Sequence, residues 1–178
     1  MANIALVINM VRGFHDIGNL ANPRTARIIP EIRDLLNSLE FQGGWETIFL
    51  RDLHRPDDPV FKTIPVHCVQ YSEETEIVEE LRPFQKFPVI DKSHYSGFYQ
   101  TQLHAALAIW RPGRVLVVGV CTDICVLHTV AGLRERGYNV VVHRDCVETY
   151  DAPNHPAEET SLWALRHMED ILGAKIIP

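Results

Sequence analysis

Short uninterrupted runs of apolar residues alternate along the chain with longer segments in which apolar residues recur every three or four positions. Uninterrupted apolarity is typical of strands covered on both faces, as in a parallel sheet. Such runs predict strands at residues 4–8, 47–50, 87–90, 115–120, 140–142 and 176–177.

The segments with helical spacing start and stop at residues that favour helix ends. Asn22 and Pro23 predict the start of a helix, and Gly43 and Gly44 predict its end. Further helices are expected after Ser72 (apolar positions Ile77, Val78 and Leu81), at 103–110, at 124–136 before Gly137, and from Pro156 (apolar positions Leu162, Leu165, Met168 and Leu172).

Strands that alternate with helices predict an α/β fold with a mostly parallel sheet. No repeat, linker or low-complexity tract interrupts the pattern, so we expect one domain over residues 1–178. In such folds ligands bind beyond the carboxyl ends of the strands. That rule directs attention to residues 9–14, 52–67, 91–98 and 119–125.

Composition narrows the class of protein. The 178 residues are 46% hydrophobic and carry a net charge of −6, which is ordinary for a globular domain and excludes disorder. The sequence has no Lys/Arg cluster and no apolar run of about 20 residues, so neither nucleic acid nor a membrane is an expected partner. No export signal opens the chain, which predicts a cytoplasmic protein whose four cysteines are free thiols.

Cys125 is the first candidate for chemistry. It follows the strongly apolar strand 115–120 and lies in the first turn of the next expected helix. A helix start lowers the pKa of a thiol and offers free N–H groups to a developing oxyanion. The alternative is that Cys125 and Cys121 are small buried residues without chemistry, as free cysteines often are.

Asp52 and His54 end the second expected strand on one side of the chain, because side chains two apart in a strand share a face. With His67 from the following loop they form a ligand set suited to zinc, iron or manganese. A capping Asp with two surface histidines is the alternative. Lys92 also follows a strand, where it can stabilise negative charge or lie exposed.

Other classes of site are absent from the sequence. No serine has the Gly-rich turn of a Ser-His-Asp hydrolase, and no Walker or GxGxxG loop is present. The remaining histidines have no spacing that indicates a site: His15, His104, His128, His143, His155 and His167.

In chain order these segments resemble the isochorismatase-like cysteine hydrolases, and within them the nicotinamidase-related branch. Four blocks carry the resemblance: residues 5–10 with Phe14, residues 51–54 through 65–68, residues 92–98, and Gly119-Val120-Cys121-Thr122-Asp123-Ile124-Cys125 through Thr129. Residues 163–167 are similar to the closing helix of the family, so the likeness covers essentially the whole chain.

The resemblance implies a three-layer Rossmann-like fold, with a six-stranded parallel sheet and helices on both faces. It implies hydrolysis of a small amide such as nicotinamide, or of a related C–N bond as in a carbamate or ureido compound, through a thioester: ammonia leaves first and water follows. Cys125 is then the nucleophile, the N–H groups of Cys121 and Cys125 form the oxyanion hole, and the Val120–Cys121 bond is cis. Lys92 matches the catalytic lysine. The metal ligands are matched by Asp52, His54 and His67, and the ring pocket by Phe14 and Tyr95. A homodimer or homotetramer is also implied.

Two positions depart from the family pattern. Asn9 stands where the family has a catalytic Asp, and an amide cannot take up a thiol proton as a carboxylate can. Val60 stands where related metal sites often carry Glu, with Asp58 as a substitute. Asn9 is compatible with an engineered trap, with a slow enzyme whose thiolate Lys92 and the helix dipole already hold, or with an inactive ligand-binding protein.

Overall fold

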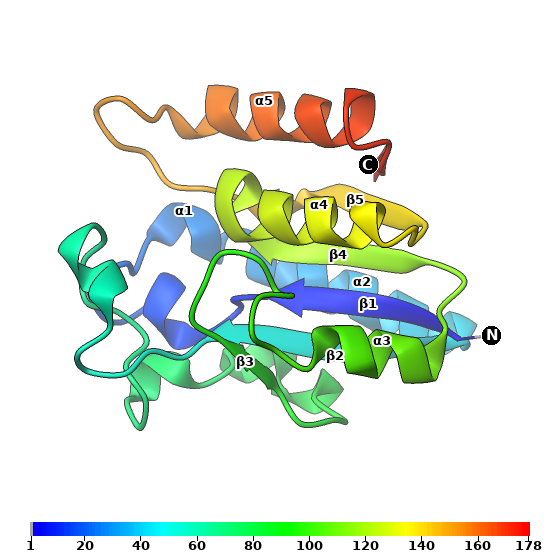
Figure 1. The fold of residues 1–178 in the computed structure, drawn as a ribbon, viewed down its shortest axis with the longest axis horizontal. Helices are drawn as coiled ribbons and strands as arrows, with labels where there is room; N and C mark the ends of the chain where they lie inside the picture. The colour runs from blue at the N-terminus through cyan, green and yellow to red at the C-terminus, as the bar shows by residue number, and fades with distance from the viewer. Residues whose placement is uncertain (1) are drawn as a thin grey trace.

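A computed structural model describes residues 2–178 and contains one six-stranded sheet in the order β3-β2-β1-β4-β5-β6 (Figure 1). Every neighbouring pair of strands is parallel. The strands are β1 (Asn3–Ile8), β2 (Trp45–Asp52), β3 (Ile90–Lys92), β4 (Val115–Val120), β5 (Val140–Glu148) and β6 (Lys175–Ile177). This confirms the parallel α/β fold that the sequence predicts.

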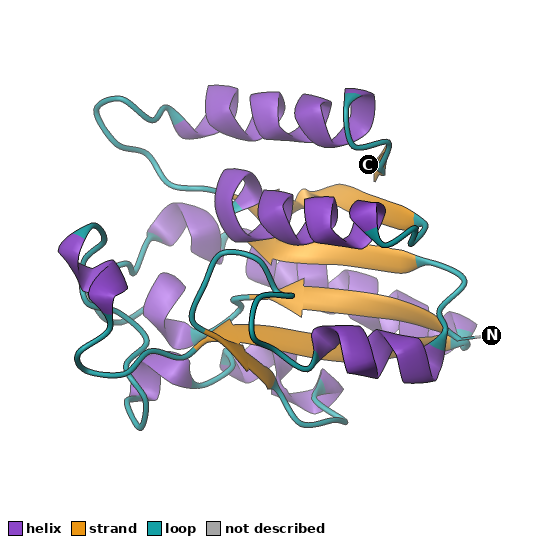
Figure 2. Cartoon of the chain, in the orientation of Figure 1, coloured by secondary structure: helices purple, strands orange, loops and turns teal. Residues whose placement is uncertain are grey.

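Helices cover both faces of the sheet (Figure 2). One face carries α1 (Pro23–Ala26) and α2 (Ile28–Gln42), and the other carries α3 (Leu103–Trp110), α4 (Leu127–Glu135) and α5 (Ala157–Asp170). None of the helices in the described residues is long and apolar enough to cross a membrane.

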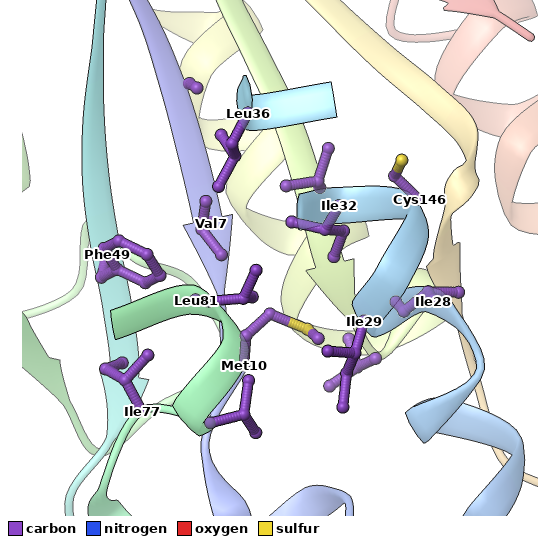
Figure 3. Close-up of a cluster of buried hydrophobic side chains, with 14 of the residues drawn as sticks. Val7, Met10, Ile28, Ile29, Ile32, Leu36, Phe49, Ile77, Leu81 and Cys146 are labelled. Carbon is purple, nitrogen blue, oxygen red and sulfur yellow. The ribbon is translucent and has the colours of Figure 1, made fainter. Parts of the chain in front are cut away.

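Side chains of β1 alternate between the two cores. Val7 packs with Ile32 and Leu36 of α2 in the cluster that Figure 3 shows. Ile4, Leu6 and Ile8 point the other way, to the side chains of α3, α4 and α5. Because both faces of the strand are buried from Ile4 to Ile8, every residue in that stretch is apolar.

The structure corrects two of the expected elements. No α-helix follows Ser72: residues Glu73–Thr75 and Glu79–Phe84 form short 3₁₀ turns, and the segment between them pairs with the chain after β1. Pro83 has no N–H for an α-helical bond to the carbonyl of Glu79. The strand expected at 87–90 lies instead at Ile90–Lys92, because Pro88 cannot donate a ladder hydrogen bond.

Two helices also differ in detail. The helix predicted from Asn22 is divided into α1 and α2, because Pro30 has no N–H to donate to the carbonyl of Ala26. Asn22 still caps α1 by accepting from the N–H of Arg24. On α5, Leu162 is 43% exposed and does not belong to the buried face as expected.

Candidate active site

The carboxyl ends of four neighbouring strands bring the candidate residues together. Asn9 follows β1, Asp52 ends β2, Lys92 ends β3, and Cys121 follows β4. The register of β2 and β3 pairs Asp52 directly with Lys92. The chain order reverses at β1, which lies between β2 and β4, and this is where doubly wound sheets bind ligands.

Cys125 lies on a π-helical turn, Thr122–Val126, which precedes α4. The turn closes when the N–H of Val126 donates to the carbonyl of Cys121 over 3.1 Å. The Val120–Cys121 peptide bond is cis, as the resemblance implies. Single π turns occur frequently at functional sites, and this one replaces the regular helix start that the sequence predicts.

Lys92 is buried and surrounded by three acceptors. Its ammonium donates to Asp52 Oδ1, to the carbonyl of His94 at 3.1 Å and to Cys125 Sγ at 3.3 Å. All three N–H bonds are therefore satisfied. The alternative of an ordinary exposed lysine is wrong, because the residue is only 3% exposed.

Asn9 is fully buried, and its side chain makes three contacts. Its Oδ1 accepts from the N–H of Asp52 at 2.9 Å. Its Nδ2 donates to Asp52 Oδ2 at 3.0 Å and lies 3.4 Å from Cys125 Sγ. Since a backbone N–H can only donate, the orientation of this amide is fixed, and the N–H₂ group faces the sulfur.

Burial and the ion pair set the pKa values of this cluster. Burial raises the pKa of the Cys125 thiol to about 11, against the lowering by Lys92. The lower pKa expected from a helix start is therefore wrong for this structure. Burial also opposes both charges of the Lys92–Asp52 pair, yet their attraction prevails: it raises the pKa of Lys92 and lowers that of Asp52 to about 2.

Asp52, His54 and His67 gather beside this cluster, with one potential ligand atom from each lying within 4.8 Å of the others. All three side chains are buried, so the alternative of a capping Asp with two surface histidines is wrong. His54 Nδ1 bonds Asp58 Oδ2 at 2.9 Å, and His67 Nδ1 bonds the carbonyl of Pro65 at 2.7 Å. Both rings thereby keep Nε2 for another partner.

These residues fit a divalent metal ion. His54 Nε2 is buried and has no hydrogen-bond partner in the described part of the chain, which leaves its lone pair available to a metal ion. Carboxylate and carbonyl partners on the far ring nitrogens are typical of metal-bound histidines. Asp58 contacts His54 and is not among the grouped ligand atoms, so its expected role as a substitute ligand is not supported.

A cavity of about 780 Å³ opens over both clusters. Cys121, Cys125, Asp52, His54 and His67 line its floor, and Phe14 and Tyr95 line its walls as expected. None of the described lining residues is Lys or Arg. Tyr150 is another lining residue, and no motif in its loop identifies it from the sequence.

Comparisons with known proteins agree with this fold. A pyrazinamidase/nicotinamidase from Streptococcus mutans UA159 is 28% identical, with a TM-score of 0.88 over 99% of this chain and 100% of that one. N-carbamoylsarcosine amidase from Thermoplasma acidophilum is 28% identical, with a TM-score of 0.84 over 99% and 95%.

A pyrazinamidase from Pyrococcus horikoshii, solved in complex with zinc, is also 28% identical, with a TM-score of 0.86 over 99% of both chains. The family model described as "Isochorismatase domain" matches residues 3–174. With nearly its whole length matched, the chain belongs to the isochorismatase family, whose amidohydrolases are its structural neighbours.

Proposed function

We propose that this protein is a cysteine-dependent amidohydrolase that cleaves a small neutral amide, with nicotinamide or a related heteroaromatic amide as the substrate. The contact between Cys125 Sγ and the Lys92 ammonium, at the floor of a 780 Å³ cavity, carries the proposal. Lys92 opposes the effect of burial on the pKa of this sulfur, and the sulfur lines the cavity in which a substrate would bind, as a nucleophile must.

The cavity favours a neutral aromatic substrate. Phe14, Tyr95 and Tyr150 supply aromatic surface, and Ile124 supplies apolar surface next to Cys125. A substrate with its own carboxylate would find no Lys or Arg among the described lining residues. Apart from the metal ion proposed below, no cationic Lys or Arg of the described lining would pair such a carboxylate, so the lining side chains favour an uncharged amide.

The proposed reaction has two steps. The sulfur of Cys125 adds to the amide carbonyl, the C–N bond breaks, and ammonia leaves with the thiol proton. Water then cleaves the thioester, giving the carboxylate, a proton and the free thiol. The N–H groups of Cys121 and Cys125 are the proposed oxyanion hole, and Lys92 holds the thiolate.

Asn9 makes this reaction slow. The family's carboxylate takes the proton from the thiol and returns it to the leaving amine, whereas the Asn9 amide presents a donor to the sulfur. Loss of a general base typically lowers a rate by about 10²–10⁴-fold. Asn9 therefore also supports a second candidate function, a ligand-binding protein with weak or no catalysis.

We further propose that Asp52, His54 and His67 hold one divalent ion, with zinc, iron and manganese as candidates. When bound, such an ion supplies a Lewis-acid site to a lone pair of the substrate. Asp58 and the Pro65 carbonyl orient the two rings toward it. The zinc complex of the Pyrococcus horikoshii relative supports this assignment.

Ammonia release from nicotinamide tests the proposal. We expect slow release by the wild-type chain, none by Cys125→Ala, and an unchanged rate for Cys146→Ala, whose sulfur is buried in the core next to α2. If the wild-type chain releases no ammonia from nicotinamide or from a panel of small amides but binds nicotinamide in a calorimeter, the binding role replaces the enzymatic one.

A further inference from the structure

The loop between β5 and α5, residues 149–156, forms one wall of the cavity. Tyr150 is the residue of this loop that lines the cavity. Its ring stacks on the ring of His155, with centroids 4.3 Å apart and planes 11° from parallel. The position of Tyr150 against a ligand therefore depends on what holds His155.

Asp123 holds the loop at both of its ends. Its Oδ1 accepts from the hydroxyl of Thr149 at 2.7 Å, and its Oδ2 accepts from His155 Nε2 at 2.9 Å. Asp123 belongs to the same π turn as Cys125. The turn that carries the sulfur and the wall that faces the ligand are thus joined through one carboxylate.

The ring of His155 is held from both nitrogens. Nε2 contacts the carboxylate of Asp123, and Nδ1 contacts the carbonyl of Tyr150 at 2.7 Å. Neither partner has a proton to give, so both bonds form only when the ring donates twice, which requires the imidazolium. The bond to Asp123 raises the pKa of His155 above 6.5, although burial opposes this.

Few other charges act on this loop. Asp123 is the charged group that faces His155, and Tyr150 is the titratable neighbour within the loop. On its other side the loop is tied to α1, where Arg24 lies 3.2 Å from Glu148 and 3.6 Å from Asp151. That second tie does not involve His155, so the backbone has support when the histidine is replaced.

We propose that His155, as an imidazolium bonded to Asp123 and to the Tyr150 carbonyl, is a positioning residue that holds Tyr150 in the cavity wall and thereby sets affinity for the amide. The part that concerns the amide rests on the proposed function. The part that concerns the loop does not, because it describes the free protein.

Hydrogen exchange of the free protein tests the loop directly. The N–H groups of Ala152 and His155 bond each other's carbonyls and report loop opening. At about pH 6 we expect exchange of residues 149–156, corrected for intrinsic rates, to be about tenfold faster in His155→Gln than in wild type. Equal exchange in the two proteins would overturn the proposal.

The contribution of His155 to loop closure should decrease as the pH rises. Because closure raises the pKa of His155, its contribution is complete below pH 6.5 and is lost as the pH rises through the raised value. The difference between wild type and His155→Gln must therefore be smaller at about pH 8.5 than at about pH 6. His104→Gln, an exposed histidine on α3, is the control and should match wild type at both pH values.

Kinetics with nicotinamide test the role in affinity. We expect His155→Gln to raise KM by about tenfold with kcat within about twofold, because the sulfur and Lys92 are untouched. A fall in kcat at unchanged KM would overturn the positioning role. If no protein in the series releases ammonia, the proposed function fails, and the exchange experiment still decides whether His155 holds the loop.

Discussion

The side-chain amide of Asn9 presents its nitrogen to the sulfur of Cys125 at 3.4 Å. The backbone N–H of Asp52 fixes this orientation by bonding Asn9 Oδ1. Lys92 is the second polar group on the sulfur, and it is also a donor. Both hydrogen-bond partners of Sγ in the described chain thus favour the thiolate, and neither can take up its proton.

Replacing Asn9 by Asp should accelerate ammonia release from nicotinamide by about 10²–10⁴-fold. The new carboxylate oxygen would occupy the place of Nδ2, next to the sulfur and 3.0 Å from Asp52 Oδ2. Repulsion between the two carboxylates raises the pKa of the new carboxyl group, which suits a general base. A steady-state ammonia assay measures the change.

Asn9→Ala is the matched control for this substitution. It removes the donor without adding a base, so its rate should not exceed that of the wild-type chain. If Asn9→Asp releases ammonia no faster than wild type, the missing carboxylate does not limit the rate. The proposal that Asn9 makes the reaction slow is then wrong.

Cys125 should be the first of the four cysteines to react with limiting iodoacetamide. All four are buried, but Cys121 and Cys125 line the cavity, and Lys92 opposes the effect of burial on the pKa of Cys125. Burial raises the pKa values of Cys68 and Cys121 further. Labelling should increase with pH, because the thiolate reacts.

Peptide mapping by mass spectrometry identifies the labelled cysteine. Lys92→Met should slow labelling of Cys125 by about tenfold, because the ammonium that lowers its pKa is gone. Preferential labelling of Cys68 or Cys146 in the wild-type chain would count against Cys125 as the nucleophile.

The sequence predicts where most of the site residues lie, because each apolar run marks a strand and the polar residues after it mark the end of that strand. Apolar runs locate β1, β2 and β4, and the polar residues that follow them meet at one edge of the sheet. Lys92 was placed after a strand expected at 87–90, yet it ends a strand at Ile90–Lys92. Only the pairing of β3 with β2 shows that Lys92 faces Asp52.

Contacts between segments that lie far apart in the chain could not be predicted from the sequence. The antiparallel bridge between Val11 and Ile77 replaces a predicted helix, and tertiary pairing decides there over local spacing. His155 has no informative spacing, since its partner Asp123 lies 32 residues away. The orientation of the Asn9 amide likewise depends on a backbone N–H of another strand.

The wild-type chain should take up one divalent ion per molecule, and His54→Ala should take up none. Two ligands hold an ion much more weakly than three, and His54 Nε2 is a buried nitrogen with no hydrogen-bond partner among the described residues. Elemental analysis after dialysis against zinc, iron or manganese and then against metal-free buffer measures the uptake. No uptake of any of the three ions by the wild-type chain would show that the cluster is not a metal site.

Asp58→Ala should weaken metal affinity by about 10–100-fold without abolishing binding. Asp58 orients the His54 ring through Nδ1 and is not one of the three grouped ligands. Asp57→Ala is the control, because this neighbouring carboxylate is exposed and pairs with Arg55. Competition with a chromogenic chelator gives the affinities. Equal losses in the two variants would indicate a general charge effect and contradict a specific role for Asp58.

Gly119→Ala should lower the free energy of unfolding by more than about 4 kcal/mol or prevent folding. Gly119 has φ +119°, and a Cβ there would overlap the carbonyl oxygen of Ile8, the residue before Asn9. Gly137→Ala is the matched control: its φ is +79°, but no atom lies within 4 Å of the added Cβ, so it should cost only about 1–2 kcal/mol. Urea denaturation compares the two. Similar losses would mean that β4 can move away from β1, and that the close approach of the strands does not fix the floor of the site.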